Sequence, residues 1–389
     1  MELVTNAKNT TRETTGEKPV VKPKRYYDYT LLILILMLVS FGLVMVTSAS
    51  VYAAVKLGHE SSFFLKRQAF FAIIGIIAML AISKLDYKWY REKFKLLLNR
   101  NLIFWGYFGC IGLQVLVMVM GKSTNGSTRW LELPVIGKFQ PSEISKIIII
   151  LVVAAIVSAR VRRLDNMLGF LVVMIPVVGL AGLVVGENLS TAIVMIGIAF
   201  IMCFVASRKW LYFILSFLAF SGAAVFAIFN VGYRADRIDQ WLHVETEGYQ
   251  ILQGLYAICS GGWFGKGLGN SVQKMGYIPE VQTDMIFTVI CEELGIFGVA
   301  ILLLVYVILL WRIFKIIVNA RDLFGSLICT GVFAHLALQI IMNIAVVTNT
   351  IPSTGVVLPF ISYGGTSLII LLAEMGIVLS VSNRIEYQE

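Results

Sequence analysis

Long apolar segments restrict the fold of this 389-residue chain more than any other feature. A helix needs roughly 20 mostly apolar residues to cross the hydrocarbon layer of a bilayer. Charged residues make up only 14% of the sequence, whereas soluble domains contain about a quarter. Ten segments suit a membrane helix, the second being short and expected to begin nearer Phe63: 29–51, 68–83, 101–120, 142–159, 167–185, 189–207, 210–229, 285–311, 323–347 and 365–383. The sequence therefore predicts an all-α polytopic membrane protein with ten transmembrane helices.

The basic residues predict how this bundle is oriented. Most of the 32 lysine and arginine residues fall in the N-terminal region and in the connections on the same side of the membrane. Because basic connections stay in the cytoplasm and an even number of helices returns the chain to its starting side, both termini are expected to be cytoplasmic. The net charge of +9 then reflects orientation and contact with anionic membrane lipid. We expect no nucleic acid partner.

The polar regions divide the chain further. Residues 1–25 are predicted to form a disordered cytoplasmic tail, and residues 26–389 the ten-helix membrane domain. Two external connections are long, 121–141 and 230–284, and loops of such length are usually functional or disordered. The loop 230–284, between helices 7 and 8, is rich in aromatic and apolar residues. We expect it to fold against the membrane surface with short helices.

Acidic residues gather where this loop enters the eighth segment, in IPEVQTDMIFTVICEELG (278–295). Thr283 or Asp284 is expected to cap the helix N-terminus, because the apolar run starts immediately afterwards. Asp284 would also lie at the outer membrane face, where its carboxylate can accept a proton from a substrate hydroxyl. The two roles are compatible. Glu280, one turn earlier, is either a solvated loop acid or a supporting residue.

Glu292 and Glu293 lie two turns deeper in the same segment. A carboxylate that faces lipid is costly, so at least one of them must face protein or trapped water. This leaves two interpretations, a hydrogen-bonded link between helices or a supporting group at a functional site.

A second polar cluster is KFQPSEISKIII (138–149). Pro141 suits the first turn of a helix, and the negative charge of Glu143, two residues later, is favourable near a helix N-terminus. Lys146 lies three residues after Glu143, so the two can pair on one face. The pair is either a structural ion pair, or a device in which Glu143 holds Lys146 toward a phosphate of a lipid substrate.

Three arginines lie on the external side: Arg129, Arg234 and Arg237. A guanidinium binds two phosphate oxygens at once, which suits a diphosphate. Arg129, which precedes Trp130, is equally suited to anchor the chain at the membrane interface.

Two glycine-containing stretches interrupt the regular pattern. GGWFGKGLGNS (261–271) follows no predicted strand, so we interpret it as a tight external turn rather than a nucleotide-binding fingerprint. IPSTGVVLPFISYGGTS (351–367) has two prolines and three glycines where a membrane helix is expected. Irregular backbone at membrane depth is tolerated where protein or a water-filled cavity covers it. The residues predicted to line such a cavity are Pro352, Thr354, Gly355, Pro359, Ser362, Tyr363, Gly364 and Gly365.

Isolated polar residues also occur in the late helices. His335 is expected to form a hydrogen bond between helices, and Asn343 to brace the broken segment 351–367. Glu374 has no assigned role. The five cysteines show no CxxC or metal-ligand spacing, which indicates buried free thiols. No metal site can be assigned from the sequence.

Taken together, these motifs resemble the SEDS family (shape, elongation, division and sporulation), which includes FtsW, RodA and SpoVE. The wording GKGLGNSVQK is closer to the FtsW and SpoVE branch than to RodA. The matching blocks are NGSTRWLEL, QPSEISK, GYQILQGLYAICSGGWFGKGLGNSVQK, IPEVQTDMIFTVICEELG and IPSTGVVLPFISYGGTS. One block departs from the family pattern, because GENLST (186–191) lacks the usual proline, so Glu187 and Asn188 receive no family role.

The resemblance implies a peptidoglycan glycosyltransferase that polymerises lipid II at the outer face of the bacterial cytoplasmic membrane. It implies that Asp284 is the catalytic residue and that Glu143 and Lys146 are important for activity. It also implies a divalent cation (magnesium or manganese), no organic cofactor, and a cognate monofunctional penicillin-binding protein as transpeptidase partner. The expected location is the division septum or the sporulation site.

Two other functions fit the same residues. A lipid II flippase would also use buried ionisable groups such as Lys146, Glu293 and Glu374, and a non-catalytic divisome scaffold would recruit the transpeptidase through its helices. A flippase needs polar groups through the whole membrane depth, whereas here they concentrate in external loops and outer helix ends. This distribution favours catalysis.

Overall fold

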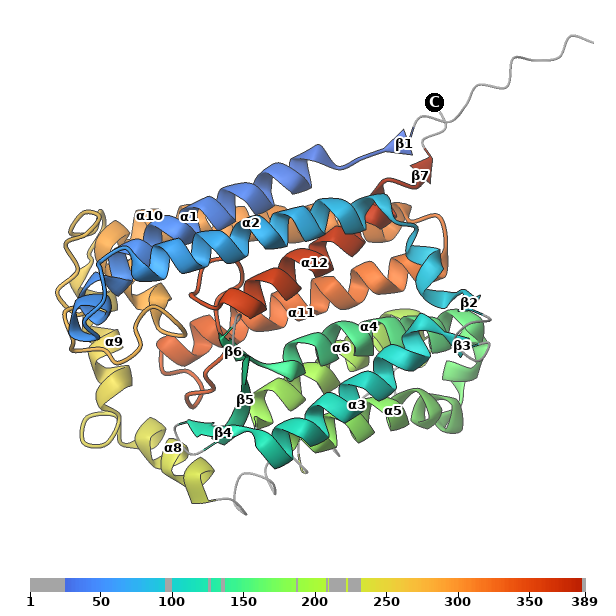
Figure 1. The fold of residues 1–389 in the computed structure, drawn as a ribbon, viewed down its shortest axis with the longest axis horizontal. Helices are drawn as coiled ribbons and strands as arrows, with labels where there is room; N and C mark the ends of the chain where they lie inside the picture. The colour runs from blue at the N-terminus through green and yellow to red at the C-terminus, as the bar shows by residue number, and fades with distance from the viewer. Residues whose placement is uncertain are drawn as a thin grey trace, which may run out of the picture.

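The computed structural model describes residues 25–94, 100–124, 127–133, 137–186, 188–207, 209, 222 and 232–386, and this part of the chain is nearly all helical (Figure 1). The helices in it that are long and apolar enough to cross a membrane are α1 (Tyr29–Lys56), α2 (Phe63–Lys84), α3 (Leu102–Met120), α4 (Pro141–Ala159), α5 (Met167–Val185), α6 (Leu189–Ala206), α10 (Ile286–Asn319), α11 (Leu323–Val347) and α12 (Gly365–Ser382). The predicted polytopic all-α fold is confirmed. The seventh predicted segment, 210–229, lies outside the described residues except for Gly222, so the count of ten and the orientation stay predictions.

Short elements connect these helices. The loop 230–284 contains the predicted short helices, here α8 (Gly232–Leu242) and α9 (Tyr249–Ser260). The strands β4 (Lys122–Thr124), β5 (Ser127–Leu133) and β6 (Gly137–Phe139) form an antiparallel sheet that the sequence analysis did not predict. The remaining short elements are η1 (Tyr87–Arg91), η3 (Val161–Asp165), β2 (Lys93–Phe94) paired with β3 (Arg100–Asn101), and β1 (Arg25–Tyr26) paired with β7 (Ile385–Glu386).

The β1–β7 pair places the beginning and the end of the described chain at the same end of the bundle (Figure 1). This arrangement agrees with the expected even number of spans. The predicted disordered tail, 1–25, lies outside the described residues apart from Arg25, which begins β1.

Glycines allow α2 and α12 to pack closely. A Cβ atom at Gly376 would lie 2.7 Å from the carbonyl oxygen of Met79, and one at Gly75 would lie 3.2 Å from the Cα of Ile369. Small residues let helix backbones approach in this way within membranes. These contacts hold α12 closely against α2 along its length.

The helix α10 is broken at Gly295, which has φ 65° and ψ −171°. A Cβ atom there would lie 2.4 Å from the backbone nitrogen of Gly265, so glycine is required for both its conformation and this contact. The eighth predicted span, 285–311, corresponds to α10, but the helix is interrupted at Gly295, which the sequence did not predict. A short helix, 286–294, precedes the long one.

Glu292 and Glu293 lie immediately before this break, where both carboxylates are buried. Glu292 pairs with Lys266 Nζ at 2.7 Å, and Glu293 pairs with Lys274 Nζ at 2.7 Å. Ser48 of α1 donates to Glu293 at 2.6 Å. The two acids thus hold the loop 261–274 against α1 and α10. Of the two interpretations, these contacts correspond to the hydrogen-bonded link. In that loop Gly262, Gly265, Gly267 and Gly269 have positive φ, as a tight turn requires.

A second buried pair joins α11 to α12. His335 Nδ1 lies 2.8 Å from Glu374 Oε2, and both side chains are buried. The expected interhelical hydrogen bond of His335 is confirmed, and Glu374 is its partner. All five cysteines are free, and four are buried as predicted, whereas Cys259 is exposed.

Candidate active site

A polar cavity lies where α4, α6 and α11 meet the segments that precede α10 and α12. Its volume of about 130 Å³ exceeds the roughly 30 Å³ share of one water molecule, so it has room for a polar part of a ligand. Its charged lining residues are Glu143, Lys146, Glu280 and Asp284, and its other lining residues are Trp130, Gln140, Asn188, Thr191, Val194, Thr283, Gln339, Gly355, Val356, Val357, Tyr363, Gly364 and Ser367.

Asp284 is half-buried in the wall of this cavity. The expectation that Thr283 or Asp284 caps the helix is wrong, because α10 begins at Ile286 with Met285 at the cap position and no side-chain cap. The Thr283 hydroxyl instead donates to the carbonyl oxygen of Glu280 at 2.6 Å, which closes a turn in which Glu280 has φ 46°. This turn leaves the carboxylate of Asp284 at the cavity rather than over the helix end.

Asn343 of α11 fixes the backbone on two sides of the cavity. Its Nδ2 donates to the carbonyl oxygen of Asp284 at 2.8 Å and to that of Val356 at 2.8 Å, and the side chain is 1% exposed. The Tyr363 backbone N–H also donates to the Gln282 carbonyl oxygen at 2.8 Å. The predicted brace on the broken segment is confirmed, and it extends to Asp284.

Replacing Asn343 with leucine is expected to lower the turnover rate about 10- to 100-fold with little change in KM. The substitution leaves two carbonyl groups without their donor and relaxes the backbone that places Asp284, and a misplacement of about 1 Å can cost 10²-fold in rate. Steady-state kinetics would check this, with Asn319→Leu, at the far end of α10, as the matched control. An unchanged turnover rate in Asn343→Leu would contradict the positioning role.

Glu143 and Lys146 form the predicted ion pair, with Lys146 Nζ 2.9 Å from Glu143 Oε2. Pro141 is at the first helical position of α4, as expected, which places Glu143 in the first turn. The side chain of Lys146 is only 3% exposed. Both residues line the polar cavity, so the pair lies at the site rather than elsewhere in the bundle.

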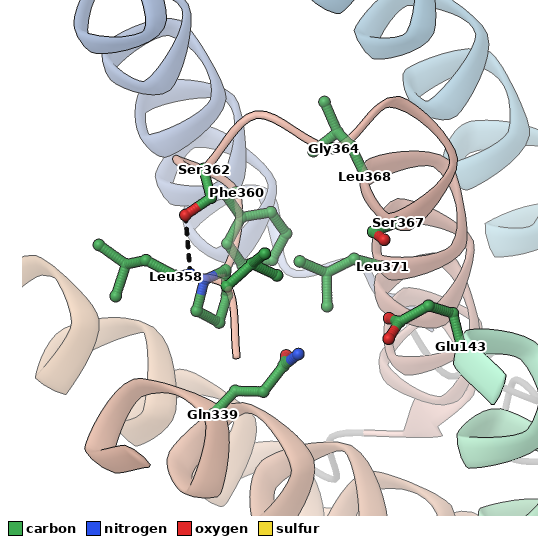
Figure 2. A pocket seen from close by; sticks show the side chains of 11 residues that line it. Glu143, Gln339, Leu358, Phe360, Ser362, Gly364, Ser367, Leu368 and Leu371 are labelled. Atoms are coloured by element: carbon green, nitrogen blue, oxygen red, sulfur yellow. Dashed lines mark hydrogen bonds between the residues drawn. The ribbon is translucent and has the colours of Figure 1, made fainter. Parts of the chain in front are cut away.

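A smaller pocket adjoins the polar cavity and shares five lining residues with it: Glu143, Gln339, Val357, Gly364 and Ser367. Figure 2 shows Glu143 and Gln339 pointing toward the pocket from two helices, opposite the irregular segment before α12. In that segment the Leu358 N–H donates to Ser362 Oγ at 2.8 Å. The broken segment therefore forms a wall of the site.

Five of the eight residues predicted to line a cavity do so. Gly355, Tyr363 and Gly364 line the polar cavity, and Pro359, Ser362 and Gly364 the adjoining pocket. Pro352, Thr354 and Gly365 line neither of these two, and their role stays a prediction. At Gly365 the ring of Phe71 fills the space, because a Cβ atom there would lie 2.2 Å from Phe71 Cδ2.

The other predicted site residues lie in different places. Glu280 is exposed and lines the cavity, whereas Glu293 is buried in its ion pair with Lys274 and is not a lining residue. Arg237 donates from Nη1 to the Ser353 carbonyl oxygen at 2.9 Å, so it braces the broken segment. Arg129 lies in β5 and Arg234 in α8, and their side chains fall outside the described part of the structure.

Sequence reasoning missed several lining residues. Gln339 lies four residues from both His335 and Asn343 on α11, and this spacing puts all three on one helix face. That pattern was available in the sequence. Asn188 caps α6 by accepting from the Thr191 N–H at 3.1 Å, and both line the cavity, although the departing block gave them no role.

Comparison with known proteins places this geometry in a family. The family model FTSW_RODA_SPOVE, described as cell cycle protein, matches residues 29–387. Stage V sporulation protein E of Bacillus subtilis (strain 168) is 39% identical over 372 residues, which cover 92% of this chain and 98% of that protein. A probable peptidoglycan glycosyltransferase FtsW of Geobacter sp. (strain M18) is 37% identical over 369 residues, covering 92% of this chain and 97% of the relative.

Solved structures give the same result. One solved structure matches with a TM-score of 0.72 and 28% identity, and the match covers 93% of this chain and 99% of the solved chain. It is described as structural coordination of polymerization and crosslinking by a peptidoglycan synthase complex. The rod shape determining protein RodA of Thermus thermophilus matches with a TM-score of 0.65 and 28% identity, covering 93% and 98%. The motif resemblance is thus confirmed, and identity is higher to the SpoVE and FtsW relatives. The chain belongs to the FtsW, RodA and SpoVE family of cell cycle proteins.

Proposed function

We propose that this multi-pass membrane protein is a peptidoglycan glycosyltransferase that polymerises lipid II at the outer face of the bacterial cytoplasmic membrane. The observation that carries the proposal is the half-buried carboxylate of Asp284, which shares one cavity with the Glu143–Lys146 pair. The name of the FtsW relative, which is 37% identical, supports the same activity.

In the proposed reaction, the 4-hydroxyl of one lipid-linked disaccharide attacks the anomeric carbon of another. The new glycosidic bond forms as the bond to the diphosphate breaks, and undecaprenyl diphosphate leaves. Asp284 acts as general base and takes the proton of the attacking hydroxyl, which is a poor nucleophile while protonated. The Asn343 hydrogen bond to the Asp284 carbonyl oxygen holds this base in place.

The leaving diphosphate needs positive charge beside it. Lys146 lines the cavity, and its ammonium has three donors. It can therefore keep its contact with Glu143 and also donate to a phosphate oxygen. Arg129 and Arg234 are proposed as further phosphate contacts from β5 and α8.

A divalent cation fits the chemistry of the cavity. Its carboxylate donors suit magnesium or manganese, although among the described residues no group of three His, Cys, Asp or Glu side chains is close enough to hold an ion. Magnesium is commonly held by one or two carboxylates together with substrate phosphates. Glu280, exposed and lining the cavity, would hold the ion with the diphosphate, and the ion would neutralise the charge of the leaving group.

The partner and location are proposed on the same basis. The solved structure of a peptidoglycan synthase complex resembles this chain over 93% of its length, so we propose a monofunctional penicillin-binding protein as transpeptidase partner. The names of the SpoVE and FtsW relatives support a role at the sporulation site or the division septum.

The test is a reconstitution of the purified chain with the transpeptidase partner, lipid II and magnesium or manganese. Glycan strands should form, and they should be absent when the chain is omitted. Movement of lipid II across vesicles without any polymer would contradict the proposal and favour a flippase.

A further inference from the structure

A second groove lies at the start of α2 and on the connection before it. In Figure 1 this start of α2 lies at the same end of the bundle as α9. It is an open surface groove rather than an enclosed cavity, with a volume of about 600 Å³. Its lining residues are His59, Glu60, Phe63, Lys66, Arg67 and Phe70. None of them lines the polar cavity.

The groove combines cations with aromatic rings. Lys66 and Arg67 occupy the first turns of α2, and the His59 ring stacks on Phe63 with centroids 4.2 Å apart. Lys66 Nζ lies 2.6 Å from Glu60 Oε2, with both side chains exposed. The hydrogen bond and charge of Lys66 lower the pKa of Glu60, so Glu60 is a carboxylate at neutral pH. With two cations and one anion, the groove complements an anionic group.

An apolar stripe continues from the groove along α2. Phe70, Ile73 and Ile77 are 56%, 59% and 62% exposed. Their spacing of three and four residues puts them on one helix face. The stripe follows Lys66 and Arg67 along α2. An anionic lipid can therefore place its headgroup at these cations and its hydrocarbon chain along the stripe.

The groove and the polar cavity lie on either side of the contact between α2 and the irregular segment before α12. Phe64, next to Phe63, contacts the ring of Tyr363 edge-on with centroids 5.0 Å apart. Gln68, next to Arg67, donates to the Ser362 carbonyl oxygen at 3.2 Å and accepts from the Gly364 N–H at 3.2 Å. Since Tyr363 and Gly364 line the polar cavity, one turn of α2 and this segment separate the two sites.

We propose that this groove is a binding site for the diphosphate of a polyisoprenoid-linked glycan, with Lys66 and Arg67 on the phosphates and the isoprenoid along α2. The glycan would then extend past Tyr363 toward Asp284. This inference rests on the proposed function. The short separation from the cavity favours a glycolipid over an ordinary phospholipid, because a phospholipid has no group that would reach Asp284.

The test measures binding rather than turnover. The full chain would be placed in nanodiscs of zwitterionic phosphatidylcholine and titrated with fluorescent lipid II, and in a second arm with fluorescent phosphatidylglycerol. Lys66→Gln and Arg67→Gln are each expected to raise the Kd for lipid II about 10- to 100-fold, since each removes charged hydrogen bonds. Lys56→Gln, an exposed cation at the end of α1 and outside the groove, should leave the Kd unchanged.

A change in the opposite direction strengthens the test. Glu60→Gln removes the anion that pairs with Lys66, so it should lower the Kd for lipid II. Arg67→Lys keeps the charge but loses the forked donor geometry, so its Kd should lie between those of the unaltered chain and Arg67→Gln.

Unchanged lipid II binding in both glutamine variants would overturn the site. So would loss of phosphatidylglycerol binding alone, which would make the groove a phospholipid site. The same titration with Asp284→Asn separates this inference from the proposed function, because that variant should bind lipid II normally. If the unaltered chain binds lipid II at the groove but makes no polymer, the site stands and the proposed function fails.

Discussion

Replacing Asp284 with asparagine is expected to lower the polymerisation rate about 10²- to 10⁴-fold, which is the usual contribution of a positioned general base. Asparagine has nearly the same shape as aspartate but cannot take the proton of the attacking hydroxyl. The Asn343 hydrogen bond to residue 284 uses the backbone carbonyl, so the local structure should survive the change. Lipid II binding should also survive.

The measurement is the initial rate of glycan formation by the chain with its transpeptidase partner. The matched control is Asp239→Asn in α8, which makes the same change on an exposed aspartate outside the cavity, and its rate should equal that of the unaltered chain. A full rate in Asp284→Asn would remove Asp284 from the mechanism.

Replacing Lys146 with methionine is expected to cost about 3–5 kcal/mol of folding stability, because it leaves the buried Glu143 carboxylate without its partner. Polymerisation should also be lost, since the cation that lines the cavity is gone. Thermal unfolding in detergent would give the stability change, and the glycan assay the activity.

The double variant Glu143→Gln/Lys146→Met separates these two effects. It has no unpaired charge, so most of the stability should return, whereas polymerisation should not. Recovery of polymerisation together with stability would show that the pair is only structural. A stability loss below about 1 kcal/mol in the single variant, typical of an exposed pair, would contradict the burial argument.

Most spans could be predicted from the sequence, because apolar length is a local property. The prediction of 323–347 matches α11, and that of 167–185 matches α5. The break at Gly295 could not be predicted, because the apolar pattern continues through it. It depends on contact with Gly265, thirty residues earlier in the chain, and this contact leaves no periodic signal.

The site was predictable where local spacing determines it. The pairing of Glu143 with Lys146 follows from their position on one helix. The place of Asp284 depends instead on the Thr283–Glu280 turn and on Asn343 from a distant helix. The groove at Lys66 and Arg67 could not be predicted, because two cations at a helix end are also typical of membrane orientation.

The most direct measurement is the structure, by electron cryomicroscopy, of the chain with its transpeptidase partner and an unreactive lipid II analogue. We expect the acceptor 4-hydroxyl within about 2.6–3.2 Å of the Asp284 carboxylate, or joined to it through one water molecule. An acceptor sugar bound outside the cavity, with its 4-hydroxyl beyond the reach of Asp284, would contradict the proposed role of this residue as the base.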